Sequence, residues 1–298
     1  MTFMVPDSPL PPCVLFEDEH LLVVNKPAGW NTHAPDPFAG EGIYDWLRHR
    51  LQRWATLAIV HRLDKETSGV MVFTKTRGKP LPDEPIHRSN GLQAIPPAHG
   101  PGALEARVHS EIQDRPRRCP LRQRPVGEPA ETRFQVLSGA SPIAGTAMIE
   151  AEPLTGRTHQ IRVHAAEQGM PILGDRLYGG APAARVFLHA AVIEFAHPTD
   201  GRKLRFEAPV DFTADSRASL RCAFIEPDLT DCHRIIHSAA DGWPGWYVDR
   251  LGDWLLSQAE GELSSAQHAE LMRLCAAYQV QGGVSQGTPP PHARSGDG

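Results

Sequence analysis

The stretch LAIVHRLDKETSGVMVFTK, residues 57–75, consists of two apolar segments separated by a polar one. The apolar segments have the composition of short strands, and KETSG (65–69) has the composition of a turn. Asp64 stands directly before that turn, so we expect its side chain to be exposed on a rigidly held backbone, as functional residues on loops often are. The structural alternative is that Asp64 caps the turn by accepting hydrogen bonds from backbone amides around Thr67 and Ser68.

Strand and helix patterns continue on both sides of this stretch. Residues 13–26 (CVLFEDEHLLVVNK) predict two strands joined by a turn, and residues 42–51 (GIYDWLRHRL) have apolar side chains at helical spacing. Further strands are predicted at 147–153 and 186–195, with a helix from about 158 to 168 between them. Because strands outnumber helices and the helices fall between strands, we expect an α+β fold on a mixed, largely antiparallel sheet with flanking helices.

Length and composition indicate a globular protein of the cytoplasm. The 298 residues can form one large domain, or a main domain with a small appendage, and 41% hydrophobic with 22% charged residues is ordinary for such a chain. No apolar run approaches the roughly 20 residues needed to cross a bilayer, and the first residues do not have the pattern of a secretory signal. The five cysteines are scattered without a CxxC pair, which fits a reducing compartment and argues against a structural zinc site.

The charge of the chain gives no support to nucleic-acid binding by itself, since the formal net charge is -5. A local basic run, residues 115–124, contains five arginines and no acidic residue. This run is either an RNA-contacting surface or a solvated loop.

A second polar motif, LTGRTHQIRVH (154–164), combines a Thr-Gly turn with the predicted start of a helix. Arg162 and His159 would lie about one helical turn apart. An arginine beside a catalytic carboxylate would keep it ionised and fixed in orientation, whereas the structural alternative is an ordinary ion pair.

Together the two motifs resemble the RluA family of RNA pseudouridine synthases. The matching segments occur in the family's order and cover most of residues 13–210; they are 15–30, 61–76, 131–137, 153–179 and 187–201. The resemblance implies the pseudouridine synthase catalytic fold and a reaction that isomerises uridine to pseudouridine in ribosomal or transfer RNA. It also implies that no metal or organic cofactor is required, and we expect a monomer that binds RNA and no membrane.

The resemblance also implies roles for particular residues. Asp64 is the essential catalytic group, which either attacks the sugar carbon or abstracts a sugar proton, and Arg162 pairs with it. Arg62 is placed to contact the RNA backbone or the flipped base. Leu173 forms either part of the apolar wall of the pocket or plain core. We expect the histidines to be hydrogen-bonded residues of the fold rather than metal ligands; they are His61, His159, His164 and His189.

The sequence departs from the family between residues 77 and 130. This segment is rich in Pro, Arg, Gly and His with little periodicity, so we expect it to be irregular. It also lacks the family tyrosine that stacks on the target uracil, because the four tyrosines lie elsewhere, at Tyr44, Tyr178, Tyr247 and Tyr278. Either compensating reading-frame shifts rewrote the segment or it is a divergent insertion. The functional alternative to an active synthase is therefore a catalytically impaired RNA-binding remnant.

A second unit is predicted after the catalytic domain, which we place at 13–212. Residues 234–261 predict a small β-hairpin appendage, followed by a short helix from about 264 to 278. The stretch is similar to the start of RlmI-type ribosomal RNA cytosine methyltransferases, so we assign 222–280 to a partial methyltransferase-like segment without that activity. Residues 281–298 are polar and rich in Pro and Gly, which predicts disorder.

Overall fold

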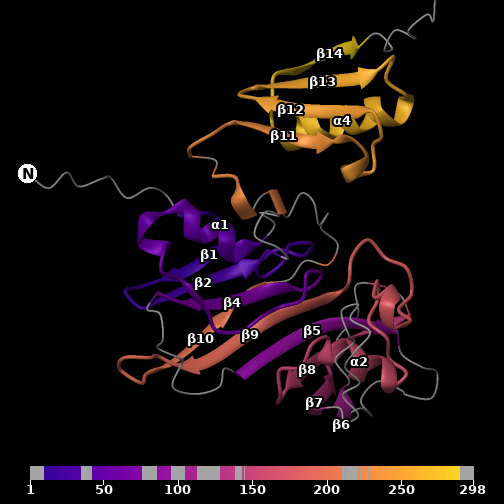
Figure 1. The fold of residues 1–298 in the computed structure, drawn as a ribbon. Coiled ribbons are helices and arrows are strands. Elements are labelled where there is room, and N and C mark those ends of the chain that lie inside the picture. Colours follow the sequence, from indigo (N-terminus) through magenta and orange to yellow (C-terminus); the bar gives the residue numbers. More distant parts are fainter. Residues whose placement is uncertain are drawn as a thin grey trace, which may run out of the picture. The chain divides into compact units, whose positions relative to one another are not determined.

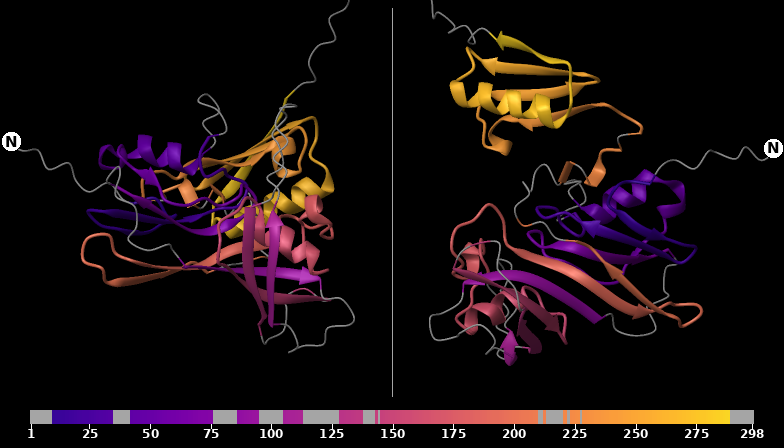
Figure 2. Two further views of the ribbon diagram at one scale, coloured as in Figure 1. Left: turned by 60° about the horizontal axis from the view of Figure 1, so that its bottom comes forward. Right: turned by 180° about the vertical axis from the view of Figure 1, so that it is seen from behind.

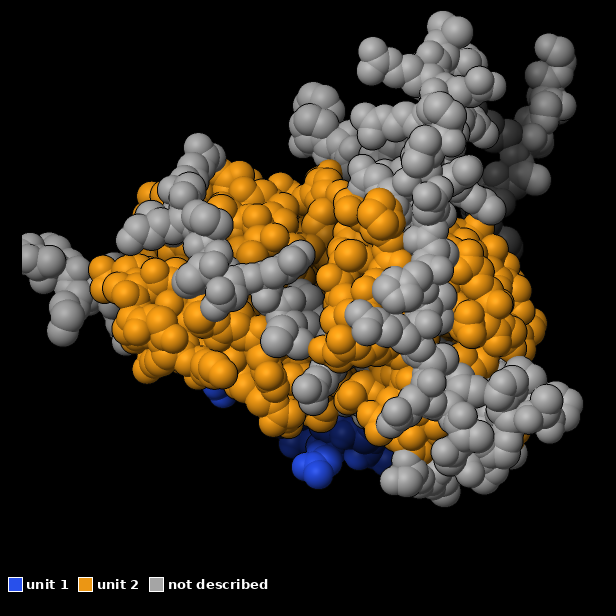
Figure 3. Space-filling view, turned by 90° about the horizontal axis from the view of Figure 1, so that it is seen from below, with its two compact units in different colours: residues 1–12, 224–298 blue, residues 13–223 orange. Residues whose placement is uncertain are grey.

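The computed structural model comprises two compact units, each of which is described by itself (Figure 3). The larger unit comprises residues 13–223, and the smaller unit comprises residues 1–12 and 224–298. The residues that the structure describes are 10–34, 42–75, 86–94, 105–112, 128–137, 143, 145–209, 212, 220–221, 223–226 and 228–288.

The larger unit is built on one ten-stranded sheet (Figure 1). Its main path runs β1-β2-β4-β9-β5-β8-β7-β6, with β3 also pairing β4 and β10 also pairing β9. Neighbouring strands are antiparallel except for β4 and β9, which confirms the largely antiparallel sheet expected from the sequence. The strands are β1 (Val14–Glu17), β2 (Leu21–Lys26), β3 (Ala58–Ile59), β4 (Ser68–Thr74), β5 (Ile86–Ala94), β6 (Glu105–Ile112), β7 (Glu128–Val136), β8 (Thr146–Pro153), β9 (Leu188–Ala196) and β10 (Lys203–Glu207).

Few helices accompany this sheet. Helix α1 (Ile43–Arg50) is followed by the 3-10 turn η1 (Gln52–Trp54), and α2 (Gln160–Glu167) lies beside β6, β7 and β8 (Figure 2). A second 3-10 turn, η2 (Arg176–Tyr178), follows α2. The expected helices at 42–51 and 158–168 are thus confirmed. Within the part of the chain that the structure describes, no helix is both long and apolar enough to cross a membrane.

Strands β2 and β4 form the most deeply buried part of the sheet. All seven residues of β4 are buried, as are most of those in β2, because apolar side chains cover both faces of these strands. On one face, Val70 and Val72 join a cluster with Ile193 of β9. On the side of α1, Tyr44 stacks on Phe73 with a ring-centroid distance of 6.1 Å.

Gly69 permits the parallel contact between β4 and β9 on which the Asp64 loop depends. It pairs with Ala190 and has a φ of 122°, a conformation that side-chain-bearing residues rarely adopt. A Cβ added at Gly69 would lie 2.2 Å from the carbonyl oxygen of Ala190. Glycine is therefore required where the turn after Asp64 meets β9.

The segment between residues 77 and 130 differs from the irregular structure expected there. Strands β5 and β6 lie within it, and β7 begins at its end. Strand β5 pairs with both β8 and β9, and β6 pairs with β7. Backbone hydrogen bonds to distant partners can specify such strands where the local side-chain pattern does not. The rest of the segment, including the arginine-rich residues 115–124, lies outside the described residues.

The smaller unit is a four-stranded sheet with one helix, which is more than the expected hairpin appendage. The helix confirms the prediction for 264–278, and Ser264 begins it with a capping box to Gln267. Trp246 is fully buried in the core, which also contains side chains from the sheet and the helix. The elements are β11 (Cys232–His237), η3 (Ser238–Asp241), β12 (Trp246–Leu251), β13 (Trp254–Glu260), α4 (Ser265–Ala277) and β14 (Gly282–Thr288).

Strand β14 occupies residues for which the sequence predicts disorder. It runs parallel to β13, with a register from Trp254↔Gly282 to Glu260↔Thr288. The sequence GGVSQGT has no apolar period, so the ladder to β13 identifies this strand and its composition does not. Residues 289–298 lie outside the described part of the chain.

Candidate active site

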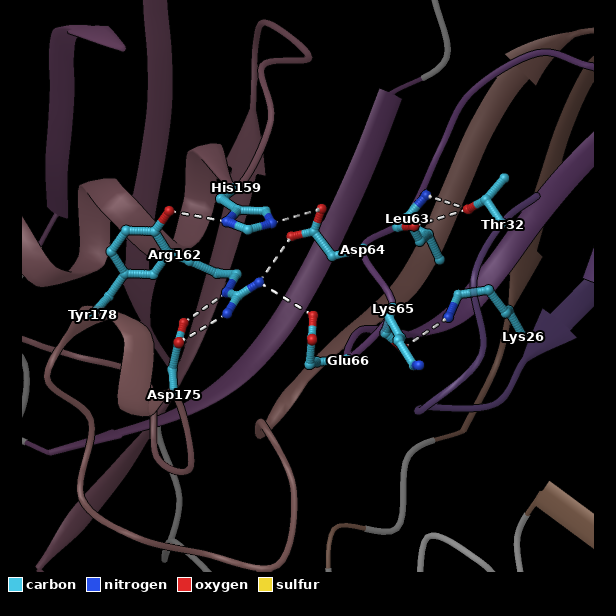
Figure 4. A network of polar contacts seen from close by, with 10 residues as sticks. All are labelled: Lys26, Thr32, Leu63, Asp64, Lys65, Glu66, His159, Arg162, Asp175 and Tyr178. Carbon is cyan, nitrogen blue, oxygen red and sulfur yellow. Dashed lines mark hydrogen bonds and ion pairs between the residues drawn. The ribbon is translucent and has the colours of Figure 1, made fainter. Parts of the chain in front are cut away.

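The loop that carries Asp64 is fixed through its backbone. The Thr67 amide donates to the Asp64 carbonyl oxygen (3.1 Å), which closes the turn. Thr32 contacts both backbone groups of Leu63, since its hydroxyl donates to the carbonyl oxygen (2.8 Å) and accepts from the amide (3.1 Å). The Asp64 side chain faces Arg162 and His159, so the turn-capping alternative is not the arrangement in the structure (Figure 4).

Arg162 is a buried guanidinium shared by three carboxylates (Figure 4). Its Nε and Nη2 donate to the two oxygens of Asp175 at 2.6 and 2.8 Å. Its Nη1 then points to Asp64 Oδ2 at 3.5 Å and Glu66 Oε2 at 3.3 Å. Burial opposes the guanidinium charge, but the hydrogen bonds and charge of Asp175, with the charges of Asp64 and Glu66, raise the pKa of Arg162 above its ordinary value.

Asp175 determines which way that guanidinium points. Its side chain is 1% exposed and forms a two-bond pair with Arg162, a planar geometry that fixes orientation as well as distance. The third nitrogen of Arg162 is thereby directed at Asp64. Asp175 lies in PILGDRLYG (171–179), the stretch in which Leu173 is the residue expected from the sequence to line the site.

His159 and Tyr178 form the other side of the site (Figure 4). His159 precedes α2 with a φ of 56°, and its Nδ1 is 2.9 Å from the Tyr178 hydroxyl. Its Nε2 lies 3.9 Å from Asp64 Oδ1. The Tyr178 ring also lies against Arg162, whose guanidinium carbon is 5.3 Å from the ring centroid.

Lys26 supports the Asp64 loop from inside the protein. It is fully buried, and its ammonium donates to the carbonyl oxygens of Trp30 (2.7 Å), Pro27 (3.1 Å) and Lys65 (3.3 Å). Burial lowers the pKa of Lys26 to about 7, while the charges of Asp64 and Glu66 oppose that shift. The lysine thus ties the end of β2 to the turn after Asp64.

A buried polar chain holds the end of that turn against β9. Arg185 donates to the Ser68 hydroxyl (2.6 Å), which lies 2.8 Å from His189 Nδ1, and His189 Nε2 lies 3.0 Å from the Ala208 carbonyl oxygen. Because a carbonyl only accepts, Nε2 carries the proton and Nδ1 accepts from Ser68. Burial lowers the pKa of His189 to about 4, so the ring is neutral at pH 7.

The predicted site residues do not all lie together. Asp64 and Arg162 are in contact, Arg62 is exposed on the same loop, and Leu173 is partly buried against the core that contains Ile149. Motif reasoning missed Asp175, Glu66, Tyr178 and Lys26. Two of them, Asp175 and Tyr178, could have been noticed in the sequence, because they are an acid and a tyrosine that lie between two glycines in PILGDRLYG. Among the described residues, no cluster of His, Cys, Asp and Glu could hold a metal ion.

Comparison with known proteins gives concordant results. A family model described as RNA pseudouridylate synthase matches residues 20–78. Ribosomal large subunit pseudouridine synthase C of Yersinia pestis is 35% identical over 215 residues, which cover 67% of this chain and 66% of that protein. The Escherichia coli K12 protein of the same name is 36% identical over 217 residues, or 66% of each chain. This chain therefore spans 66% of the length of these relatives, slightly less than two thirds.

Among solved structures, the human protein named RNA Pseudouridylate Synthase Domain Containing 1 has the same fold. Its TM-score is 0.50 at 20% sequence identity, and the match covers 74% of this chain and 93% of the human chain. At that identity the match bears on architecture alone.

Proposed function

We propose, since this chain belongs to the RNA pseudouridine synthase family, that its larger unit isomerises uridine to pseudouridine in RNA with Asp64 as the catalytic group. The observation that carries the proposal is the position of the Asp64 carboxylate. It is partly exposed on a loop whose backbone is fixed on both sides, and Arg162 directs one nitrogen at it. A carboxylate held in this way is available to a substrate and fixed in orientation.

The chemistry requires such a group. The N1–C1′ bond of the nucleotide breaks, the base turns, and a C5–C1′ bond forms, with no oxidation or reduction. Asp64 acts either as a nucleophile at C1′ or as a base toward the sugar, and both routes need a positioned carboxylate. Arg162, clamped by Asp175, keeps that carboxylate in place through the reaction.

The substrate we propose is ribosomal or transfer RNA, with large-subunit ribosomal RNA favoured by the names of the relatives. The target base must leave its stack, which costs a few kcal/mol and favours a uridine in a loop or bulge. Arg62 is exposed beside Asp64, where it would contact a phosphate or the flipped base. One side of Leu173 packs on the core. The other side would form part of the apolar wall of the pocket for the target base.

A second candidate function is an RNA-binding remnant without turnover. The observation in its favour is that the sequence has no tyrosine between Lys75 and Ala130. Both candidates require binding of RNA, and only the first requires chemistry at Asp64.

The test is pseudouridine formation by the purified chain on unmodified ribosomal and transfer RNA transcripts, together with filter binding of the same RNAs. We expect product from the wild type and a loss of at least about 10,000-fold in Asp64→Asn, with RNA binding retained. Asp200→Asn makes the same chemical change on an exposed turn of the larger unit and should leave the rate unchanged. RNA binding by the wild type without product would favour the remnant.

A further inference from the structure

We propose that His159 is the group that accepts the C5 proton of the target uracil, and that Tyr178 positions its ring. The inference rests on the proposed isomerisation and deepens it. From the sequence, His159 is expected to be a hydrogen-bonded residue of the fold. The structure places it beside Asp64 with one ring nitrogen bound and the other facing the carboxylate.

The reaction itself calls for such a group. When the C5–C1′ bond forms, C5 carries both the sugar and its original hydrogen. A base must take that proton so that the C5=C6 double bond is restored. N1, which gave up its bond to the sugar, gains a proton, so the reaction as a whole consumes none.

The position of the base is limited by the geometry of the bonds. Asp64 acts on the sugar of the target nucleotide, either at C1′ or at a proton close to it, and C5 becomes bonded to C1′. A proton acceptor must come within about 3 Å of C5 to act, which places it no more than roughly 7–8 Å from the Asp64 carboxylate. His159 Nε2, at 3.9 Å from Asp64 Oδ1, lies well inside that range.

Other polar groups around Asp64 are poorer acceptors. The guanidinium of Arg162 has no acceptor atom, and the Lys26 ammonium donates to three carbonyl oxygens. The Glu66 carboxylate accepts a hydrogen bond from Arg162 and is held by that guanidinium. The imidazole of His159, whose Nε2 faces Asp64, therefore suits the role best.

Tyr178 holds the direction of the ring, and its hydroxyl can accept a hydrogen bond from Nδ1–H, which suits the tautomer that the role needs. When His159 Nδ1–H donates to the Tyr178 hydroxyl at 2.9 Å, Nε2 has a lone pair and faces the side of Asp64. The arrangement is that of a base oriented by a third group. After the transfer, the imidazolium lies beside the negative Asp64 carboxylate, which stabilises it until the proton passes to water.

The positive φ of His159 allows substitutions that remove the imidazole without straining the backbone. Asparagine tolerates this conformation well and glycine prefers it, so His159→Asn and His159→Gly keep the local backbone. We expect His159→Asn to lower kcat by about 100- to 10,000-fold, with RNA binding within about threefold of wild type. Imidazole added to His159→Gly should restore turnover in a concentration-dependent manner, which a purely structural role would not produce. Tyr178→Phe should lower kcat by a smaller factor.

Isotope substitution identifies the step. With RNA containing 5-deuterouridine, His159→Asn should show a normal deuterium effect on kcat that is larger than that of the wild type, because proton removal from C5 has become slow. The inference is overturned if His159→Asn keeps kcat within about threefold of an active wild type. It is also overturned if imidazole does not rescue His159→Gly, or if Glu66→Gln gains the isotope effect instead. A wild type that makes no pseudouridine refutes the proposed function, which is a separate outcome.

Discussion

Replacing Asp175 by asparagine tests how the buried ion pair with Arg162 holds the site. The change keeps the shape of the side chain and removes its charge. The side-chain oxygen of asparagine can accept a hydrogen bond from one nitrogen of the Arg162 guanidinium. The NH2 group of asparagine then faces the other guanidinium nitrogen. Two donors meet there, and one of the two hydrogen bonds, of 2.6 and 2.8 Å, is lost. Both partners are almost completely buried, so little water can compensate.

The magnitude follows from the burial of the two charges. Removing one partner of a buried pair costs about 3–5 kcal/mol because the other charge stays behind. Arg162 retains Asp64 at 3.5 Å and Glu66 at 3.3 Å, so we expect the lower end, about 3 kcal/mol of the free energy of unfolding. For a unit of this size that corresponds to a lower melting temperature by roughly 6–12 °C. We expect kcat to fall about 100-fold, because the released Arg162 side chain no longer fixes the Asp64 carboxylate.

The assay is urea unfolding combined with hydrogen–deuterium exchange. Peptides from β4 and β9 should lose protection in Asp175→Asn, while peptides of the smaller unit serve as an internal reference. Glu66→Gln is the matched variant, since it removes a carboxylate from the same guanidinium at an exposed position and should cost less than about 1 kcal/mol. Equal costs for the two variants, or a cost below about 1 kcal/mol for Asp175→Asn, would refute the reasoning.

Two further predictions concern the packing around the site. Gly174 has a φ of 82° and its added Cβ would lie 1.7 Å from the Arg185 carbonyl oxygen, so Gly174→Ala should cost at least about 3 kcal/mol in urea unfolding. Gly179 has a φ of 86° with open space, so Gly179→Ala should cost about 1–2 kcal/mol, and equal losses would rule out the clash. The neutral His189 binds its proton more weakly in the folded chain (pKa about 4) than in the unfolded chain, whose value is near 6.5. Its contribution to stability is therefore complete above about pH 6.5 and is lost as the pH falls toward 4, by about 2 kcal/mol between pH 7 and pH 5. Unfolding measured at both pH values should show a smaller loss in His189→Asn, and identical losses would contradict the assignment.

Local patterns predicted the elements that are defined by their own side chains. The apolar runs of β2 and β4 and the helical spacing of α1 are visible in the sequence because burial selects those residues directly. Strands β5, β6 and β14 were not predicted, since their pairing partners rather than their own periodicity define them.

The candidate site was likewise predicted only in part. Asp64 and Arg162 stand out in recognisable motifs, and the structure brings them together although 98 residues separate them. The clamp by Asp175 and the approach of His159 depend on how α2 and η2 pack, which motif spacing does not encode. His159 lies in the same motif as Arg162, and Asp175 lies between glycines in residues 171–179, but neither stretch indicates which group the side chain would contact.

The parallel contact between β4 and β9 has a consequence for synthesis of the chain. Ser68 and His189, which meet there, are 121 residues apart. At a translation rate of about 5–20 residues per second, β9 leaves the ribosome roughly 6–24 s after β4. During that interval β4 can pair with β2 along one edge and with β3 at Phe73 and Thr74 on the other edge, but the start of β4, at Ser68 and Gly69, still lacks the partner that β9 supplies. The nascent chain therefore passes through a stage in which backbone groups at the start of the buried strand β4 are open to other molecules, and the arrival of β9 pairs them.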